Sequence, residues 1–77
     1  MKVQVFAMLK DYFDKEFQLS GNIHNAEILK QHLARANPAA AGILERCRFA
    51  VNDEFVDSHF QLSENDTICI IPPSSGG

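Results

Sequence analysis

The sequence predicts a single α+β domain in which one main helix packs on one face of a mixed β-sheet. Segments with the alternating pattern of strands stand on both sides of one amphipathic helical segment, residues 26–36. Near the end of the chain, residues 67–71 are largely apolar toward both faces, which is typical of a central strand. With 77 residues, 45% of them hydrophobic, the chain is long enough to form one small core.

Two strands are predicted before the helix. Residues 2–8 alternate in side-chain type and include Val and Phe, which predicts the first strand. Residues 9–15 are polar and aromatic and indicate a turn or a single helical turn. Residues 16–20 place Phe17 and Leu19 on one face and predict a second, shorter strand, and a hairpin is the economical way to pair it with the first.

The clearest helix signal lies in residues 25–37. Asn25 is a favourable N-cap residue. The apolar stripe expected to face the core consists of Ala26, Leu29, Leu33 and Ala36. The pair Asn37-Pro38 ends this helix, because a residue before proline disfavours the α conformation, and it can open a second, short helix that reaches about residue 46.

Three more strands are predicted after the helices. Residues 47–52 alternate, an Asn-Asp pair follows as a turn signal, and residues 54–56 indicate a short edge strand. The polar segment after this strand is expected to be anchored in the core by Phe60 and Leu62. Residues 67–71 then form the central strand, which is expected to pair in parallel with a neighbour.

One face of the predicted sheet has no helix to cover it. The apolar residues expected there, as a partner-binding surface, are Phe6, Met8, Cys69 and Ile71. The alternative is that loops cover this face.

The last predicted strand leads directly into Pro-Pro-Ser-Ser-Gly-Gly, residues 72–77. Since two prolines end strand pairing and no large apolar side chain follows, residues 1–71 are predicted to fold and residues 72–77 to form a flexible, extended tail. The two glycines lack Cβ and can pass through a narrow channel, which makes the terminal carboxylate of Gly77 the candidate working group. The alternatives are a frayed terminus or a remnant of an expression vector.

Composition argues against several classes of protein. The net charge of −3 and the seven scattered Lys and Arg residues argue against nucleic acid as the main partner, and they favour a basic partner surface. No stretch approaches the roughly 20 apolar residues of a membrane span, and the N-terminus lacks the apolar segment of a signal peptide. A cytoplasmic location is therefore expected.

Patterns of catalytic or metal-binding residues are not found in the sequence. No Ser-His-Asp or Cys-His arrangement and no glycine-rich phosphate loop is present. Cys47 and Cys69 are expected to be free thiols in a reducing compartment, and no zinc-ligand spacing connects them with the three histidines. We therefore expect no bound metal or cofactor, and no enzyme that acts on its own.

The order of these motifs resembles that of the ubiquitin-like β-grasp sulfur carriers and, among them, the family of molybdopterin synthase small subunits. The matching parts are residues 3–10, residues 25–33, residues 50–52, Leu62, Asp66 and residues 71–77. The Pro-Pro-x-x-Gly-Gly ending is the specific part, since related thiamine-pathway carriers share the Gly-Gly but usually not the two prolines. This sequence departs from the family at Ile71, where an aromatic residue is common, and at Ser74, where valine is common.

The resemblance implies that Gly77 is adenylated by an activating enzyme that uses ATP, receives sulfur from a donor as a thiocarboxylate, and passes it to a pterin precursor. It also implies a large-subunit partner in a heterotetramer, with the catalytic acid–base groups on that partner. The tail residues expected to enter the partner are Pro72, Pro73, Ser74, Ser75 and Gly76. The alternatives are a sulfur carrier for thiamine or tRNA thiolation, a ubiquitin-like protein modifier, and an interaction domain whose Gly-Gly is incidental.

Overall fold

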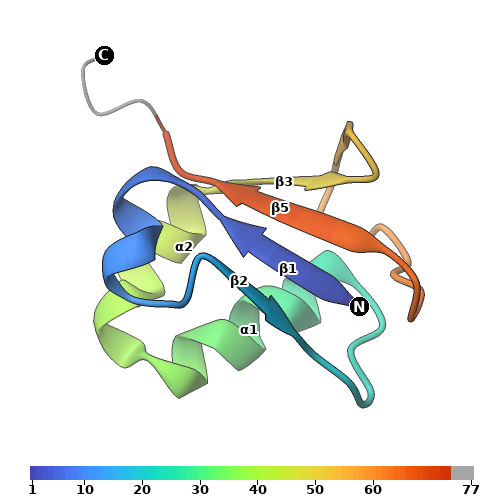
Figure 1. Cartoon of the computed structure of the whole chain (residues 1–77), viewed down its shortest axis with the longest axis horizontal. Coiled ribbons are helices and arrows are strands. Elements are labelled where there is room, and N and C mark those ends of the chain that lie inside the picture. Colours follow the sequence, from blue (N-terminus) through green and yellow to red (C-terminus); the bar gives the residue numbers. More distant parts are fainter. Residues whose placement is uncertain (74–77) are drawn as a thin grey trace.

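The computed structural model describes residues 1–73, and residues 74–77 of the predicted tail lie outside the described part. One sheet and the helices on one side of it form two layers (Figure 1). The strands are β1 (Lys2–Val5), β2 (Glu16–Gln18), β3 (Arg48–Val51), β4 (Glu54–Val56) and β5 (Thr67–Ile71). The α-helices are α1 (Ala26–Ala36) and α2 (Ala41–Arg46), and the 3₁₀ helices are η1 (Ala7–Asp11) and η2 (Pro38–Ala40).

The sheet is mixed, with strand order β2-β1-β5-β3-β4. The central strand β5 pairs in parallel with β1 and antiparallel with β3, as the apolar run in residues 67–71 predicted. The carboxyl ends of β1 and β5 therefore lie at the same end of the sheet as the start of β3. We call this the exit end, because β5 finishes there at Ile71.

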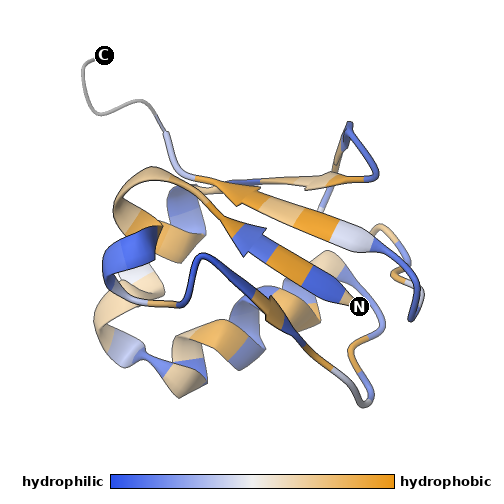
Figure 2. Cartoon of the chain, viewed as in Figure 1, coloured by the Kyte–Doolittle hydropathy of each residue, from blue (hydrophilic) through white to orange (hydrophobic). Residues whose placement is uncertain are grey.

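The core lies between the sheet and the helices. Burial alternates along β1 and β5, so that Val3, Val5, Ile68 and Ile70 face the helices. Figure 2 shows the alternation along β1 as successive hydrophilic and hydrophobic residues. One face of the sheet therefore packs in the core, and the side chains of the alternate residues point away from the helices on the other face.

The helix α1 begins and packs as predicted. The backbone N–H of Ile28 donates to Oδ1 of Asn25 at 2.8 Å, which confirms Asn25 as the N-cap. Ala26, Leu29 and Leu33 are buried in the core. Ala36 is exposed, so the prediction that it faces the core is wrong, and the buried stripe ends one turn before the helix does.

Two predictions in the N-terminal and loop regions are also wrong. The first strand was expected to reach residue 8, but β1 ends at Val5, because Ala7 has a positive φ of 53° and turns the chain into η1. The turn sends Leu9 into the core. Phe60 was expected in the core but is 40% exposed, since its backbone N–H donates to the carbonyl of Asp57 and keeps it in a surface turn.

Candidate functional site

The candidate site is the sheet face opposite the helices, at the exit end. On this face Cys69 of β5 pairs with Gln4 of β1 on one side and Ala50 of β3 on the other. Ala50 in turn pairs with Phe55 of β4, so these four residues form one row across the sheet. The next row toward the exit end contains Ile71, opposite Arg48.

The structure places the four predicted partner residues unequally. Cys69 and Ile71 lie on this face and are half-buried. Phe6 follows β1 with an extended backbone, so its side chain keeps the alternation of Gln4 and points to the same face, where it is 42% exposed. Met8 belongs to η1, and its expected place on a strand is wrong for the reason given above. The predicted tail residues 74–77 are outside the described part, whereas Pro72 is buried and Pro73 is exposed.

Two residues of this face were missed by the reading of the sequence. Phe55 is 56% exposed, and the guanidinium carbon of Arg48 lies 3.9 Å from the centroid of its ring. A two-residue turn after β3 pairs Ala50 with Phe55, so the turn signal alone could have placed this aromatic ring beside Ala50 of β3. The exposed Arg48 could then have been placed beside Ile71 from the strand register.

The thiols of the two cysteines are free but poorly suited to nucleophilic chemistry. Cys69 donates a hydrogen bond to Oε1 of Gln4 at 3.4 Å, and burial together with the charge of Asp53 raises the pKa of its thiol. Cys47 donates to the carbonyl of Ile43 at 3.1 Å, and burial raises the pKa of its thiol to about 11. Both side chains are therefore protonated near neutral pH, and neither offers a thiolate for sulfur transfer.

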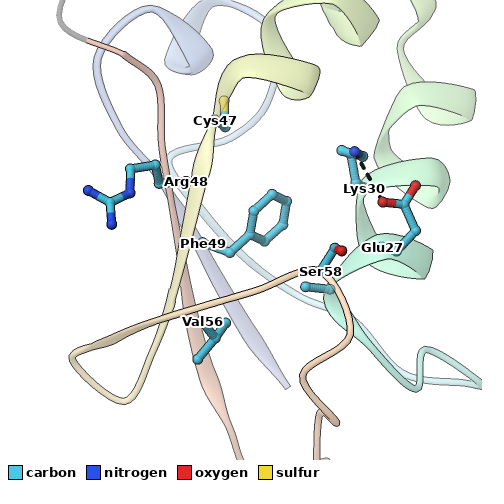
Figure 3. Close-up of a pocket in the computed structure, with 8 residues that line it drawn as sticks. Glu27, Lys30, Cys47, Arg48, Phe49, Val56 and Ser58 are labelled. Carbon is cyan, nitrogen blue, oxygen red and sulfur yellow. Dashed lines mark ion pairs between the residues drawn. The ribbon is translucent and has the colours of Figure 1, made fainter.

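A separate hollow of about 200 Å³ lies between α1 and the β3–β4 hairpin (Figure 3). Two of its lining residues pair with each other, since Nζ of Lys30 lies 3.1 Å from Glu27, and the same Nζ lies 3.3 Å from Glu45. Figure 3 also shows Phe49 and Arg48 leaving β3 in opposite directions, Phe49 toward α1 and Arg48 away from it. Arg48 therefore borders the hollow, but its side chain extends away from α1.

Within residues 1–73, no three His, Cys, Asp or Glu side chains gather closely enough to hold a metal ion. No helix in the same range is long and apolar enough to cross a membrane.

Comparison with known proteins gives consistent matches. The profile of the ThiS family matches residues 3–77. A molybdopterin synthase sulfur carrier subunit from Chlamydomonas reinhardtii is 34% identical, over 100% of this chain and 98% of that protein. A protein of the same name from Dictyostelium discoideum is 32% identical, over 99% of this chain and 94% of its own length.

A solved structure supports the same grouping. One chain in the protein–protein complex of subunits 1 and 2 of molybdopterin-converting factor from Helicobacter pylori superimposes with a TM-score of 0.70. It is 25% identical, and the match covers 99% of this chain and 96% of that one. The two-layer α+β architecture described above is therefore shared with a subunit of a known two-component assembly.

Proposed function

This chain belongs to the ThiS family, and we propose that it is the sulfur carrier subunit of a molybdopterin synthase. The observation that carries the proposal is the match, over nearly the whole of both chains, to two proteins named as such subunits. The Pro-Pro-Ser-Ser-Gly-Gly ending agrees with this role, because a carrier needs a terminal carboxylate that can reach into other proteins.

The described part of the chain supports a tail that starts from the central strand of the sheet. The central strand β5 is hydrogen-bonded to a neighbour on each side, and Pro72 directly after it is buried. Pro73 is exposed and lacks a backbone N–H, so it cannot extend the pairing. The sheet therefore sets the direction in which the chain leaves the body.

The proposed chemistry takes place at the carboxylate of Gly77. Attack of this carboxylate on the α-phosphorus of ATP, in an activating enzyme, releases pyrophosphate and forms an acyl adenylate with AMP as a good leaving group. A persulfide sulfur then displaces AMP, and cleavage of the resulting acyl disulfide by a thiol leaves the thiocarboxylate. A thiocarboxylate is ionised at neutral pH and is a strong nucleophile, which suits it to attack a pterin precursor.

The partner in this proposal is the large subunit of the synthase, arranged with the small subunit as a heterotetramer in the cytoplasm. The tail enters the large subunit, which supplies the catalytic acid–base groups. Around the start of the tail, the sheet face opposite the helices, which we call the open face, contacts the large subunit through Phe6, Cys69 and Ile71, with Met8 at its margin. The complex of two subunits in the Helicobacter pylori structure supports a partner of this kind.

Intact-mass measurement tests the proposal. The chain is incubated with an activating enzyme from the same organism, ATP and a persulfide sulfur donor, and a parallel sample omits ATP. We expect a mass that corresponds to one oxygen replaced by sulfur, only in the sample with ATP. An unchanged mass in both samples would contradict sulfur carriage.

The acceptor separates this role from its alternatives. The thiocarboxylated chain, mixed with the large subunit and the pterin precursor, is expected to produce molybdopterin. Sulfur loading without this conversion would point to thiamine or tRNA thiolation. Isopeptide-linked adducts on other proteins would point to a ubiquitin-like modifier instead.

A further inference from the structure

Arg48 occupies a defined place at the start of the tail. It is the first residue of β3 and pairs with Ile71, the last residue of β5. Its guanidinium carbon lies 3.9 Å from the centroid of the Phe55 ring. Figure 3 shows its side chain directed away from α1 and the core. The guanidinium therefore lies on the open face. Its strand partner Ile71 is only two residues before Pro73 in the sequence.

Contact with the Phe55 ring restricts the conformations of the Arg48 side chain but leaves its N–H donors available for hydrogen bonds. A guanidinium attracted to an aromatic face still has its N–H donors around its own edge, where they can bind a carboxylate with two parallel hydrogen bonds. Phe55 is itself 56% exposed, so the pair is accessible from outside. Phe55 is thus a positioning residue, and Arg48 is the group that it presents.

The exit end carries basic side chains that form no ion pair within residues 1–73. The ion pairs among residues 1–73 use the cations of Lys2 and Lys30, and none includes Arg48. Lys10 and Lys15 are also outside these pairs, and together with Glu16 they line a hollow of about 310 Å³ at the end of β1. Arg48 is therefore a cation with no ion-pair partner among residues 1–73, in a chain whose net charge is −3.

We propose that Arg48, positioned by Phe55, determines specificity for the large subunit by binding a carboxylate on its docking surface. This inference rests on the proposed function, because a tail that enters the large subunit brings the exit end of the sheet against that protein. Arg48 pairs with Ile71 directly before the tail, so it must then lie within or at the rim of the interface. Complementarity requires an Asp or Glu of the large subunit opposite Arg48, even where the net charge of −3 favours a partner surface that is basic elsewhere.

The salt dependence of the binding affinity tests the role of the Arg48 charge. The full-length chain and its variants are titrated against the large subunit from the same organism, from about 50 mM to about 500 mM NaCl. Arg48→Gln is expected to weaken binding at low salt by about tenfold and to flatten the salt dependence. Arg48→Glu is expected to weaken it further through repulsion, and Arg48→Lys to weaken it less, since the charge remains but the planar fork is lost.

Matched controls separate this contact from general electrostatics. Arg35→Gln removes the same charge from an exposed position on α1, on the opposite side of the sheet, and is expected to leave affinity and salt dependence unchanged. Phe55→Tyr keeps the aromatic face and is expected to retain the salt dependence, whereas Phe55→Leu keeps the apolar contact and is expected to flatten it. Equal effects of Arg48→Gln and Arg35→Gln would overturn the proposal.

Zero-length crosslinking identifies the carboxylate. A carbodiimide couples a lysine amine to a carboxylate with loss of water, so the Arg48→Lys variant is expected to give a crosslink to an Asp or Glu of the large subunit that the wild-type chain does not give. Absence of a new crosslink, together with unchanged binding of Arg48→Gln, would overturn this inference alone, provided that the wild-type chain binds and accepts sulfur. Failure of the wild-type chain to bind the large subunit would overturn the proposed function as well.

Discussion

Leu33 is 2% exposed and lies among the buried residues of α1 that pack against the sheet. Leu33→Ala is expected to lower the free energy of unfolding by about 2–5 kcal/mol, because it removes buried apolar surface and leaves a cavity. Urea denaturation measures the loss. His32→Ala changes an exposed neighbour on the same helix and is expected to stay within about 0.5 kcal/mol of wild type. Equal stability of Leu33→Ala and wild type would show that this face of α1 does not pack in the core.

Glu27 contributes stability that depends on pH. The hydrogen bond from Lys30 is the main cause that holds the pKa of Glu27 below its ordinary value of 4.5. The pKa of Lys30 is raised. Partial burial alone would lower it, but the hydrogen bonds and charges of Glu27 and Glu45 together outweigh that effect. A carboxyl group with a lowered pKa stabilises the fold above its unfolded pKa, and this contribution disappears as the pH falls through the folded value.

The comparison of wild type with Glu27→Gln tests this dependence. Wild type is expected to be the more stable protein near neutral pH, and the difference is expected to vanish as the pH falls from about 5 to about 3. Urea denaturation at several pH values measures the difference. Glu64→Gln, at an exposed carboxylate outside the described ion pairs, is the control and should show no such convergence. A gap that persists at the lowest pH would contradict the assignment.

Among the elements, the β3–β4 hairpin determines where Phe55 lies. Its two turn residues, Asn52 and Asp53, have positive φ values of 49° and 73°, which is typical of a type I′ turn. The side chain of Asn52 donates to Asp66 at 3.1 Å and accepts from the backbone N–H of Thr67 at 3.2 Å. These bonds tie the turn to the start of β5, so hairpin and central strand keep a fixed register.

The turn contains strain that a substitution can relieve. Asp53→Gly is expected to raise the free energy of unfolding by about 0.5–1 kcal/mol, because glycine adopts a positive φ without a Cβ clash and Asn-Gly is the preferred type I′ pair. Asp53→Ala removes the same charge but keeps the Cβ, and it is expected to be less stable than wild type. Thermal and urea denaturation measure both variants. A gain in both would show that charge, not backbone conformation, limits stability here.

The elements were predicted well where local sequence decides them, and poorly where packing does. The mixed sheet, the Asn25 cap and the central position of residues 67–71 follow from residue types alone and are confirmed. The end of β1 was missed because alternation continues through Phe6 to Met8 in the sequence, while the chain turns at Ala7 to bury Leu9. Phe60 was misplaced because an apolar residue in a polar loop need not reach the core.

At the scale of the whole molecule, folding and sulfur transfer should be separable. Removing Gly77, or replacing Gly76 with Phe, is expected to abolish thiocarboxylate formation or transfer and to leave the thermal unfolding midpoint unchanged. The reason is that the core described above lies within residues 3–70. Intact mass and a thermal melt measured on the same samples check both statements. Unfolding of the Gly77 deletion would show instead that the terminus belongs to the folded body.

The sequence by itself determined the α+β class, the central apolar strand and the Pro-Pro-Ser-Ser-Gly-Gly ending, because each is encoded by neighbouring residues. The candidate site residues 74–77 stay predictions, since they lie outside the described part of the chain. Only the tertiary structure decided that Arg48 lies beside Ile71 and that its guanidinium packs on the ring of Phe55. The physical reason is strand register. One β-hairpin and one antiparallel pairing bring residues that are far apart in the chain to the same face of the sheet, and neighbouring residues in the sequence do not encode that pairing.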